Sequence, residues 1–337
     1  MHQIEINKET GEANHFFVGE TPWHGLGKRF EEAPGTVEEA IQAAGLDWTV
    51  EKRQLYMESP GEGGRAARKI AVPGAFATVR TSDESVLGTV GSRYSVLQNK
   101  DAFKIFQPFL DANEAEFHTA GSLYEGKSIW VMAKIKRPPL VVLKDDIVEK
   151  YIILSHGHDG FATVSFGLTP IRVVCNNTLT LSLKHQDSRF IKVRHTKKVA
   201  ENLQTVSETI NTADAVFEAS ADVYQRMAKF AVNAKSLEKF VRRVHKVDLQ
   251  IANDKVHPIT RASMNRLVEL FESGRGTDIK GVKGTLWALY NAWTEYISWE
   301  RGNSADSRLS RMWNSSAQSN NPGPRGFDAA VELLKAA

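Results

Sequence analysis

The sequence predicts an α+β protein with an antiparallel, β-rich N-terminal half and a mostly helical, long-helix C-terminal half. Up to residue 195, short runs of alternating, β-branched and aromatic residues dominate, whereas apolar residues recur at helical spacing from residue 196 onward. The hydrophobic content of 42% is ordinary for a globular chain. We therefore expect an α+β domain over residues 1–195 and a helical region over residues 196–337.

Local patterns place the elements of the N-terminal half. Thr36 followed by Glu39 has the spacing of a capping box, which predicts a helix over residues 36–44. Asn99 precedes apolar residues at helical spacing, which predicts a helix over residues 99–112. The glycine-rich stretch 59–68 reads as a polar loop. Strands are expected at residues 48–57, 69–81, 86–97, 128–136, 151–156 and 161–167.

A heptad row predicts one long helix over residues 196–231. Two interpretations stay open, because the row can pack in a hairpin with helices at 235–247 and 258–273, or form a subunit contact in a homo-oligomer. A further helix is expected at 285–301, then a polar tail and a short helix at 327–335. The row consists of Val199, Leu203, Val206, Ile210, Ala213, Phe217, Ser220, Tyr224, Met227 and Ala231.

The cysteine content, the hydropathy and the net charge exclude several classes of protein for this chain. The single Cys175 excludes an intrachain disulfide and a multi-cysteine zinc site, and its apolar context favours a small core residue. No run approaches the roughly 18 apolar residues of a membrane helix, and the first ten residues do not resemble a signal peptide. We expect a cytoplasmic protein with no membrane association. A net charge of +3 does not by itself imply nucleic acid.

The distribution of the cations is more informative than the net charge. Six lysines and arginines lie between residues 184 and 198, with Asp187 the only acid among them. Such a segment can hold phosphates. We expect the Thr169-Pro170 corner to send Arg172 out beside this segment, and Arg93 and Tyr94 to offer a cation and a ring before a helix start. A second basic run at 235–246 favours a solvated helix end. The predicted nucleic-acid-binding residues are Arg93, Tyr94, Arg172, Lys184, Arg189, Lys192, Arg194, Lys197 and Lys198.

Residues 121–128, GSLYEGKS, match the phosphate-binding P-loop pattern. That pattern requires a helix directly after the lysine, because the helix N-terminus supplies the amides and the dipole that bind phosphate. Residues 129–136 instead alternate like a strand. We interpret Tyr124-Glu125-Gly126 as a hairpin turn and expect no nucleotide cofactor.

His156, His158 and Asp159 lie close together in sequence and, with His24, contain the donor types of a metal site. Gly157 and Gly160 indicate that the chain turns there, and loop histidines without a metal are commoner. We expect no metal cofactor. No catalytic residue is assigned, because no nucleophile or paired carboxylate is identifiable near His158. Glu295 and Arg301, on the expected helix at 285–301, are interpreted as structural.

Four motifs in order carry a family resemblance. They are ETPWHGLG at 20–27, VGSRYSVLQNKDAF at 90–103, the stretch 151–183 and NAWTEYISWERGN at 291–303. With these motifs the chain resembles the phage/plasmid-like proteins grouped as domain of unknown function 932. That resemblance implies a bacterial host cell and work on DNA in replication, recombination or defence.

The overall layout also resembles the Rad-type single-strand annealing proteins, without a shared motif. This resemblance implies a homo-oligomer that holds single-stranded DNA in a basic groove. We expect a single-stranded-DNA-binding protein of DNA recombination that acts without ATP or metal, and we favour a non-enzymatic role. A metal- or nucleotide-dependent enzyme of DNA metabolism and a protein-interaction factor that binds a host partner remain as alternatives.

Overall fold

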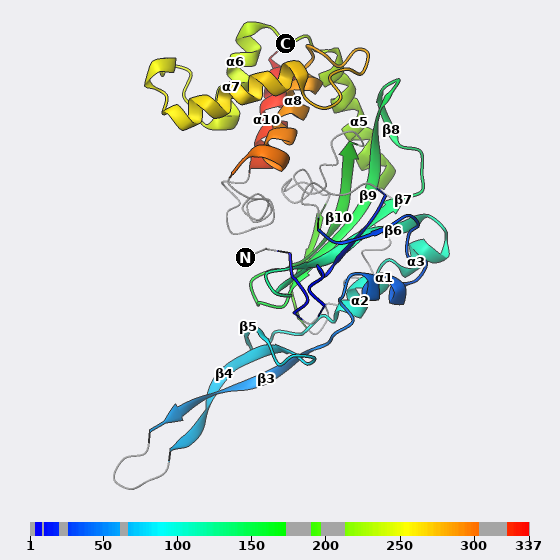
Figure 1. Ribbon diagram of the computed structural model, residues 1–337, viewed down its shortest axis with the longest axis vertical. Coiled ribbons are helices and arrows are strands. Elements are labelled where there is room, and N and C mark those ends of the chain that lie inside the picture. Colours follow the sequence, from blue (N-terminus) through cyan, green and yellow to red (C-terminus); the bar gives the residue numbers. More distant parts are fainter. Residues whose placement is uncertain are drawn as a thin grey trace.

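The computed structural model describes residues 4–8, 10–19, 26–60, 67–172, 190–196, 213–302 and 322–336. A large sheet forms the middle of the molecule, a β-ribbon projects from one end, and a group of helices covers the other end (Figure 1). Strands dominate before residue 195 and helices after it, so the predicted α+β class is confirmed. No helix in the described ranges is long and apolar enough to cross a membrane.

The central sheet has the strand order β11-β10-β9-β7-β6-β1-β2, and β8 pairs with β9 beside this path. Its neighbours are antiparallel except for the parallel pair β1 and β2. The strands are β1 His15–Val18, β2 Lys28–Phe30, β6 Ala115–Leu123, β7 Ser128–Ile135, β8 Leu140–Leu143, β9 Asp146–Gly157, β10 Val164–Arg172 and β11 Phe190–Val193.

A second sheet, of order β3-β4-β5, forms the projecting ribbon from β3 Val50–Ser59, β4 Arg68–Arg80 and β5 Val86–Gly91. The β3–β4 register shifts between Gln54 and Tyr56, where β4 contains extra residues. The amide nitrogen of Gln54 donates to the carbonyls of Val72 at 2.7 Å and Ala75 at 3.1 Å, which fixes this bulge. Bulges bend a strand and increase its twist.

Three short helices pack against the central sheet: α1 Val37–Ala43, α2 Asn99–Lys104 and α3 Gln107–Asp111. The predicted capping box of Thr36 and Glu39 is confirmed at the start of α1. The single helix expected over 99–112 is wrong, because the chain divides into α2 and α3. Pro108 lies in the first turn of α3, a position that tolerates the missing N–H of proline.

The helical half contains α5, α6 and α7, followed by α8, which continues into a π-helical turn, and by α10. The elements are α5 Ala213–Lys229, α6 Ala234–His245, η3 Asn253–Lys255, α7 Pro258–Ser273, α8 Leu286–Glu295, η4 Tyr296–Glu300 and α10 Pro322–Lys335.

The described part of the heptad row packs inside the chain. Phe217, Tyr224 and Met227 are buried, and α5 lies against β8, α8 and α10. The subunit contact expected through this row is therefore wrong for residues 217–227, and its main partners are not the helices at 235–247 and 258–273 that the hairpin hypothesis named. Residues 197–212 of the row lie outside the described residues.

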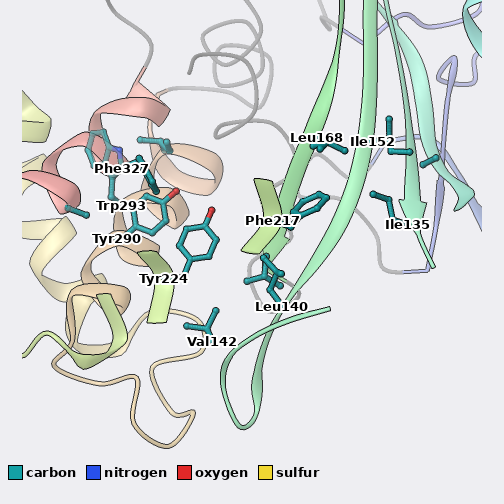
Figure 2. Packing of buried hydrophobic residues seen from close by; sticks show 14 of the residues in the cluster. Ile135, Leu140, Val142, Ile152, Leu168, Phe217, Tyr224, Tyr290, Trp293 and Phe327 are labelled. Atoms are coloured by element: carbon teal, nitrogen blue, oxygen red, sulfur yellow. The ribbon is translucent and has the colours of Figure 1, made fainter. Parts of the chain in front are cut away.

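One hydrophobic core joins the sheet to the helices. In Figure 2, Phe217 of α5 lies against the sheet beside Leu140 and Leu168, while Tyr224 faces the aromatic residues of α8 and α10. The rings of Tyr224 and Trp287 lie 4.9 Å apart. The sheet and the helical half are thus held together by a shared apolar interior.

Candidate nucleic-acid interface

The structure separates the predicted nucleic-acid-binding residues into three groups. Arg93, Tyr94 and Arg194 meet at the ribbon end of the central sheet, and Lys192 lies in strand β11, opposite Ser165 of β10. Arg172 lies at the far end of β10. Lys184, Arg189, Lys197 and Lys198 lie outside the described residues.

The prediction for Arg172 is wrong. Strand β10 continues through Pro170 to Arg172 without the expected corner, and the Arg172 side chain is only 4% exposed. Its Nε and Nη2 donate to the two oxygens of Asp146 at 2.7 and 2.5 Å. Asp146 also accepts from the Trp287 indole at 2.7 Å. A buried arginine needs such a paired carboxylate, so Arg172 joins the sheet to helix α8 instead of facing a ligand.

At the ribbon end, backbone contacts bring the 93–95 segment to the residues that follow β11. The amide of Ser95 donates to the carbonyl of His195 at 3.0 Å. The rings of Tyr94 and His195 stack with their centroids 4.8 Å apart and their planes at 17°. Arg93 directly precedes Tyr94, and Arg194 directly precedes His195. The stacked rings therefore bring the two arginines to the same surface.

Tyr94 has a packing role in the structure, and contact between its ring and a base stays a prediction. His195 already covers one face of the ring, and the hydroxyl donates to the carbonyl of Gly157 at 2.9 Å. Burial, followed by the charge of Asp159, raises the pKa of the Tyr94 hydroxyl. Tyr94 thus anchors the segment that carries Arg93 to the end of β9.

Lys52 of the ribbon fixes the same segment from the other side. Its ammonium group donates to the carbonyls of Ser92 at 2.8 Å and Tyr94 at 3.0 Å, and lies 4.6 Å from the centre of the Phe76 ring. The backbone around Arg93 is therefore held between the ribbon and the central sheet, so the position of Arg93 is set by two elements.

Arg93 and Arg194 are exposed, and neither forms an ion pair with a residue that the structure describes. Phe161, which is 91% exposed, follows Gly160, and a methyl group on Gly160 would lie 3.0 Å from the Thr89 carbonyl, four residues before Arg93. Phe161 belongs to the turn between β9 and β10, and β10 begins at Val164, which pairs with Val193 directly before Arg194. We refer to Arg93, Arg194 and Phe161 as the arginine surface.

The sequence interpretation missed Phe161, because residues 161–167 were assigned to a strand. The available signal was Asp159-Gly160, which marks a turn directly before the aromatic residue. In the structure, Gly160 has a φ of +84°, and the Asp159 carboxylate accepts from the amides of Phe161 at 2.9 Å and Ala162 at 3.1 Å. This Asx-type turn holds Phe161 outside the sheet.

Three histidines form a buried layer beneath the arginine surface. The ring of His156 lies 4.9 Å from that of His158 and 6.1 Å from that of His195. His158 Nε2 donates to the Asn99 side-chain oxygen at 3.0 Å. Both ring nitrogens of His156, Nδ1 of His158 and Nε2 of His195 have no hydrogen-bond partner within the described part of the chain.

These histidines are held neutral. Burial, and then the charges of His195 and Arg80, lower the pKa of His158 to about 3, and burial lowers the pKa of His156 well below its ordinary value. Among the described residues, no group of three or more His, Cys, Asp and Glu is arranged to hold a metal ion. Asp159 is occupied by its turn, and His24 lies outside the described residues. The three buried histidines therefore pack beneath the arginine surface as neutral side chains.

The P-loop-like match is a β-hairpin, so the predicted turn is confirmed. Gly121 lies in β6, Ser128 begins β7, and Leu123 pairs with Ser128 across the turn. Tyr124, Glu125 and Gly126 all have positive φ. No helix N-terminus follows Lys127, which removes the amides and the dipole that a phosphate loop uses.

Lys127 lines a pocket of about 600 Å³ between the hairpin, the N-terminal segment and the ribbon. Arg80 in the same pocket is buried and pairs with Glu5 at 2.6 Å, with its guanidinium 4.3 Å from the Trp48 ring centre. Asp47, Asp83 and Glu125 also line this pocket. These carboxylates oppose a polyphosphate, so the pocket does not restore a nucleotide site.

Comparison with known proteins adds one relationship. No curated protein and no solved structure matches the chain. The family model described as Domain of unknown function (DUF932) matches residues 86–320, a range that includes the whole arginine surface and most of the helical half. The chain therefore belongs to the family of domain of unknown function 932.

Proposed function

We propose that this protein binds single-stranded DNA across the arginine surface. The observation that carries the proposal is the placement of an almost fully exposed phenylalanine, Phe161, beside Arg93 and Arg194, two exposed arginines without an ion pair in the described part of the chain. An exposed aromatic ring stacks on any base, and unpaired cations bind any phosphate. This combination favours sequence-tolerant binding of an unpaired strand.

The electrostatic part of the binding follows from counterion release. Each phosphate neutralised by an arginine or lysine releases condensed ions, so affinity falls as salt rises. Strand β11 lies at the edge of the sheet, and the basic sequence from Lys184 to Lys198 runs into and out of it. The positive charge of that sequence adds to the electrostatic attraction that we propose for the strand.

The proposed activity requires no ATP and no metal. Binding by stacking and charge neutralisation involves no bond breakage, and the one nucleotide-like motif forms a hairpin. The family resemblance supports a setting on phages or plasmids, where a protein of this kind holds single strands during replication or recombination. Annealing of complementary strands in a homo-oligomer is the activity that we propose for such binding.

The test is a salt-titrated binding assay with labelled single-stranded and double-stranded DNA. We expect preferential single-strand binding that weakens with salt, and a loss of at least tenfold for the variants Arg93→Glu/Arg194→Glu and Phe161→Ala. The matched control is Arg226→Glu, an exposed arginine on α5 at the other end of the molecule. It should bind like the wild type.

Two outcomes would overturn the proposal. Absence of binding at about 50 mM salt, where nonspecific phosphate contacts are strong, would favour the protein-interaction alternative. An equal loss in Arg226→Glu and in the arginine-surface variants would show that net charge, and not this surface, determines binding.

A further inference from the structure

The outer part of the β3–β4 ribbon has no packing partner in the described chain. Strand β5 pairs with β4 only over residues 75–79, so the pairs from Tyr56 and Ala71 outward form a bare two-stranded ribbon (Figure 1). Tyr56 is 58% exposed and Met57 is 54% exposed, although they point to opposite faces. A two-stranded ribbon of this kind is marginally stable alone, so contact with a ligand would stabilise it.

One face of the ribbon begins at the arginine surface. The extra residues of the bulge between Gln54 and Tyr56 lie in β4, so the side chains of β3 keep alternating and Lys52, Tyr56 and Glu58 share a face that twists at the bulge. Lys52 holds the segment that carries Arg93, as described above. The face of Lys52 therefore leads from the arginine surface outward along β3.

Strand β4 adds a cation to this face. Glu58 pairs with Lys69 across the ribbon, so Lys69 and Tyr56 are on the same side. Lys69 is exposed and forms no ion pair with any residue the structure describes. An exposed ring and an exposed cation thus recur on the ribbon, although here Glu58 lies directly opposite the cation and reduces its attraction for phosphate.

We infer that this ribbon face is a second contact for the same DNA strand, with Tyr56 stacking on a base and Lys69 binding a phosphate. The inference rests on the proposed function. Tyr56 lies four positions beyond Lys52, which corresponds to about 13 Å along the strand. A short oligonucleotide on the arginine surface does not reach Tyr56, whereas a longer one occupies both sites.

The opposite face of the ribbon provides the matched control. Met57 and Ile70 pair there, both exposed and uncharged, and the next pair outward on that face is Ser59 with the exposed Arg68. If the ribbon served instead to bind a second copy of the chain, these apolar residues would form the contact. Replacement of Met57 therefore separates binding of DNA from self-association.

The experiment measures affinity for single-stranded oligonucleotides of about 3 to about 40 nucleotides, since about 3 nucleotides span only about 10 Å. The variants Tyr56→Ala, Lys69→Ala and Met57→Ala are measured beside the wild type. We expect Tyr56→Ala to weaken binding of the long oligonucleotides by roughly tenfold and to leave the shortest ones unchanged. Lys69→Ala should lower the salt slope by about one for the long oligonucleotides alone. Met57→Ala should bind all lengths like the wild type.

The experiment distinguishes a failure of the proposed function from a failure of the ribbon contact. A wild-type protein that binds no oligonucleotide overturns the proposed function and this inference together. Binding by the wild type with no loss in Tyr56→Ala and Lys69→Ala overturns the inference and leaves the arginine surface in place. A fall in molecular mass for Met57→Ala, measured by light scattering without DNA, would identify the ribbon as a self-association element and would also overturn the inference.

Discussion

The two ends of the central sheet have arginines in opposite environments. At the helical end, Arg172 is buried and bound to both oxygens of Asp146. At the ribbon end, Arg93 and Arg194 are exposed and have no ion pair in the part of the chain that the structure describes. Burial therefore separates the arginines into two kinds. The buried Arg172 stabilises the fold through its ion pair, whereas the exposed Arg93 and Arg194 keep their charges in contact with solvent.

The largest effect expected from this comparison is on stability at the helical end. Arg172→Met leaves Asp146 buried without its cation, and we expect the free energy of unfolding to fall by about 3–5 kcal/mol. Urea denaturation measures it. Arg194→Met, the control from the ribbon end, should change stability by no more than about 0.5 kcal/mol. Equal losses in the two variants would contradict the division between the two ends.

A smaller effect is expected in the hairpin at the ribbon end. A methyl group on Gly121 would lie 2.5 Å from the Trp130 ring and 2.8 Å from the carbonyl of Asn14, so Gly121→Ala should cost about 1–3 kcal/mol. Gly91→Ala is the control, since nothing lies within 4 Å of its added methyl group. Thermal unfolding with and without ATP should show no stabilisation by ATP in the wild type or in Gly121→Ala. Stabilisation of the wild type alone would support a phosphate loop.

The smallest expected effect is the pH dependence of the histidine layer. The folded pKa values of His156 and His158 lie below the unfolded value of about 6.5, so the unfolded chain binds more protons and stability falls as the pH drops below 6.5. The loss continues until the folded pKa is reached, at about 3 for His158. Each neutral histidine contributes up to about 1.4 kcal/mol for each pH unit.

Urea unfolding between pH 7.5 and 5.5 measures this dependence. His156→Leu should reduce the loss of stability by up to about 1.4 kcal/mol for each pH unit. The same variant should not destabilise the protein at pH 7.5, because both ring nitrogens of His156 lack partners in the described chain. An unchanged pH dependence, or a strong loss of stability at pH 7.5, would show that His156 has a partner that holds its ring nitrogens.

Local sequence patterns predicted the elements whose periodicity is strong. The ribbon strands, β7 and the capping box of α1 were found in this way. Strand β6, by contrast, was missed, because AEFHTAGSL mixes small and polar residues without a regular alternation of apolar and polar side chains. Its burial comes from the strands beside it in the sheet. The short strands β1, β2, β8 and β11 likewise depend on pairing with distant segments.

The candidate site was predictable only in part, for the same reason. Arg93 and Arg194 were found as cations in basic or polar segments, and the structure brings them together through a contact between Ser95 and His195, 100 residues apart. Arg172 was misplaced because its burial depends on Asp146 and Trp287, which sequence spacing does not connect to it. Phe161 was hidden in a run of strand-forming residues.

The bond between Asp146 and Trp287 also has a consequence for how the protein is made. The two residues are 141 positions apart in the chain. At about 5–20 residues per second, a ribosome completes Trp287 about 7–30 s after Asp146. After strand β11 has been made, the ion pair and the apolar face of the sheet half stay uncovered until helix α8 follows. We therefore expect the nascent chain to depend on chaperones between these two points of synthesis.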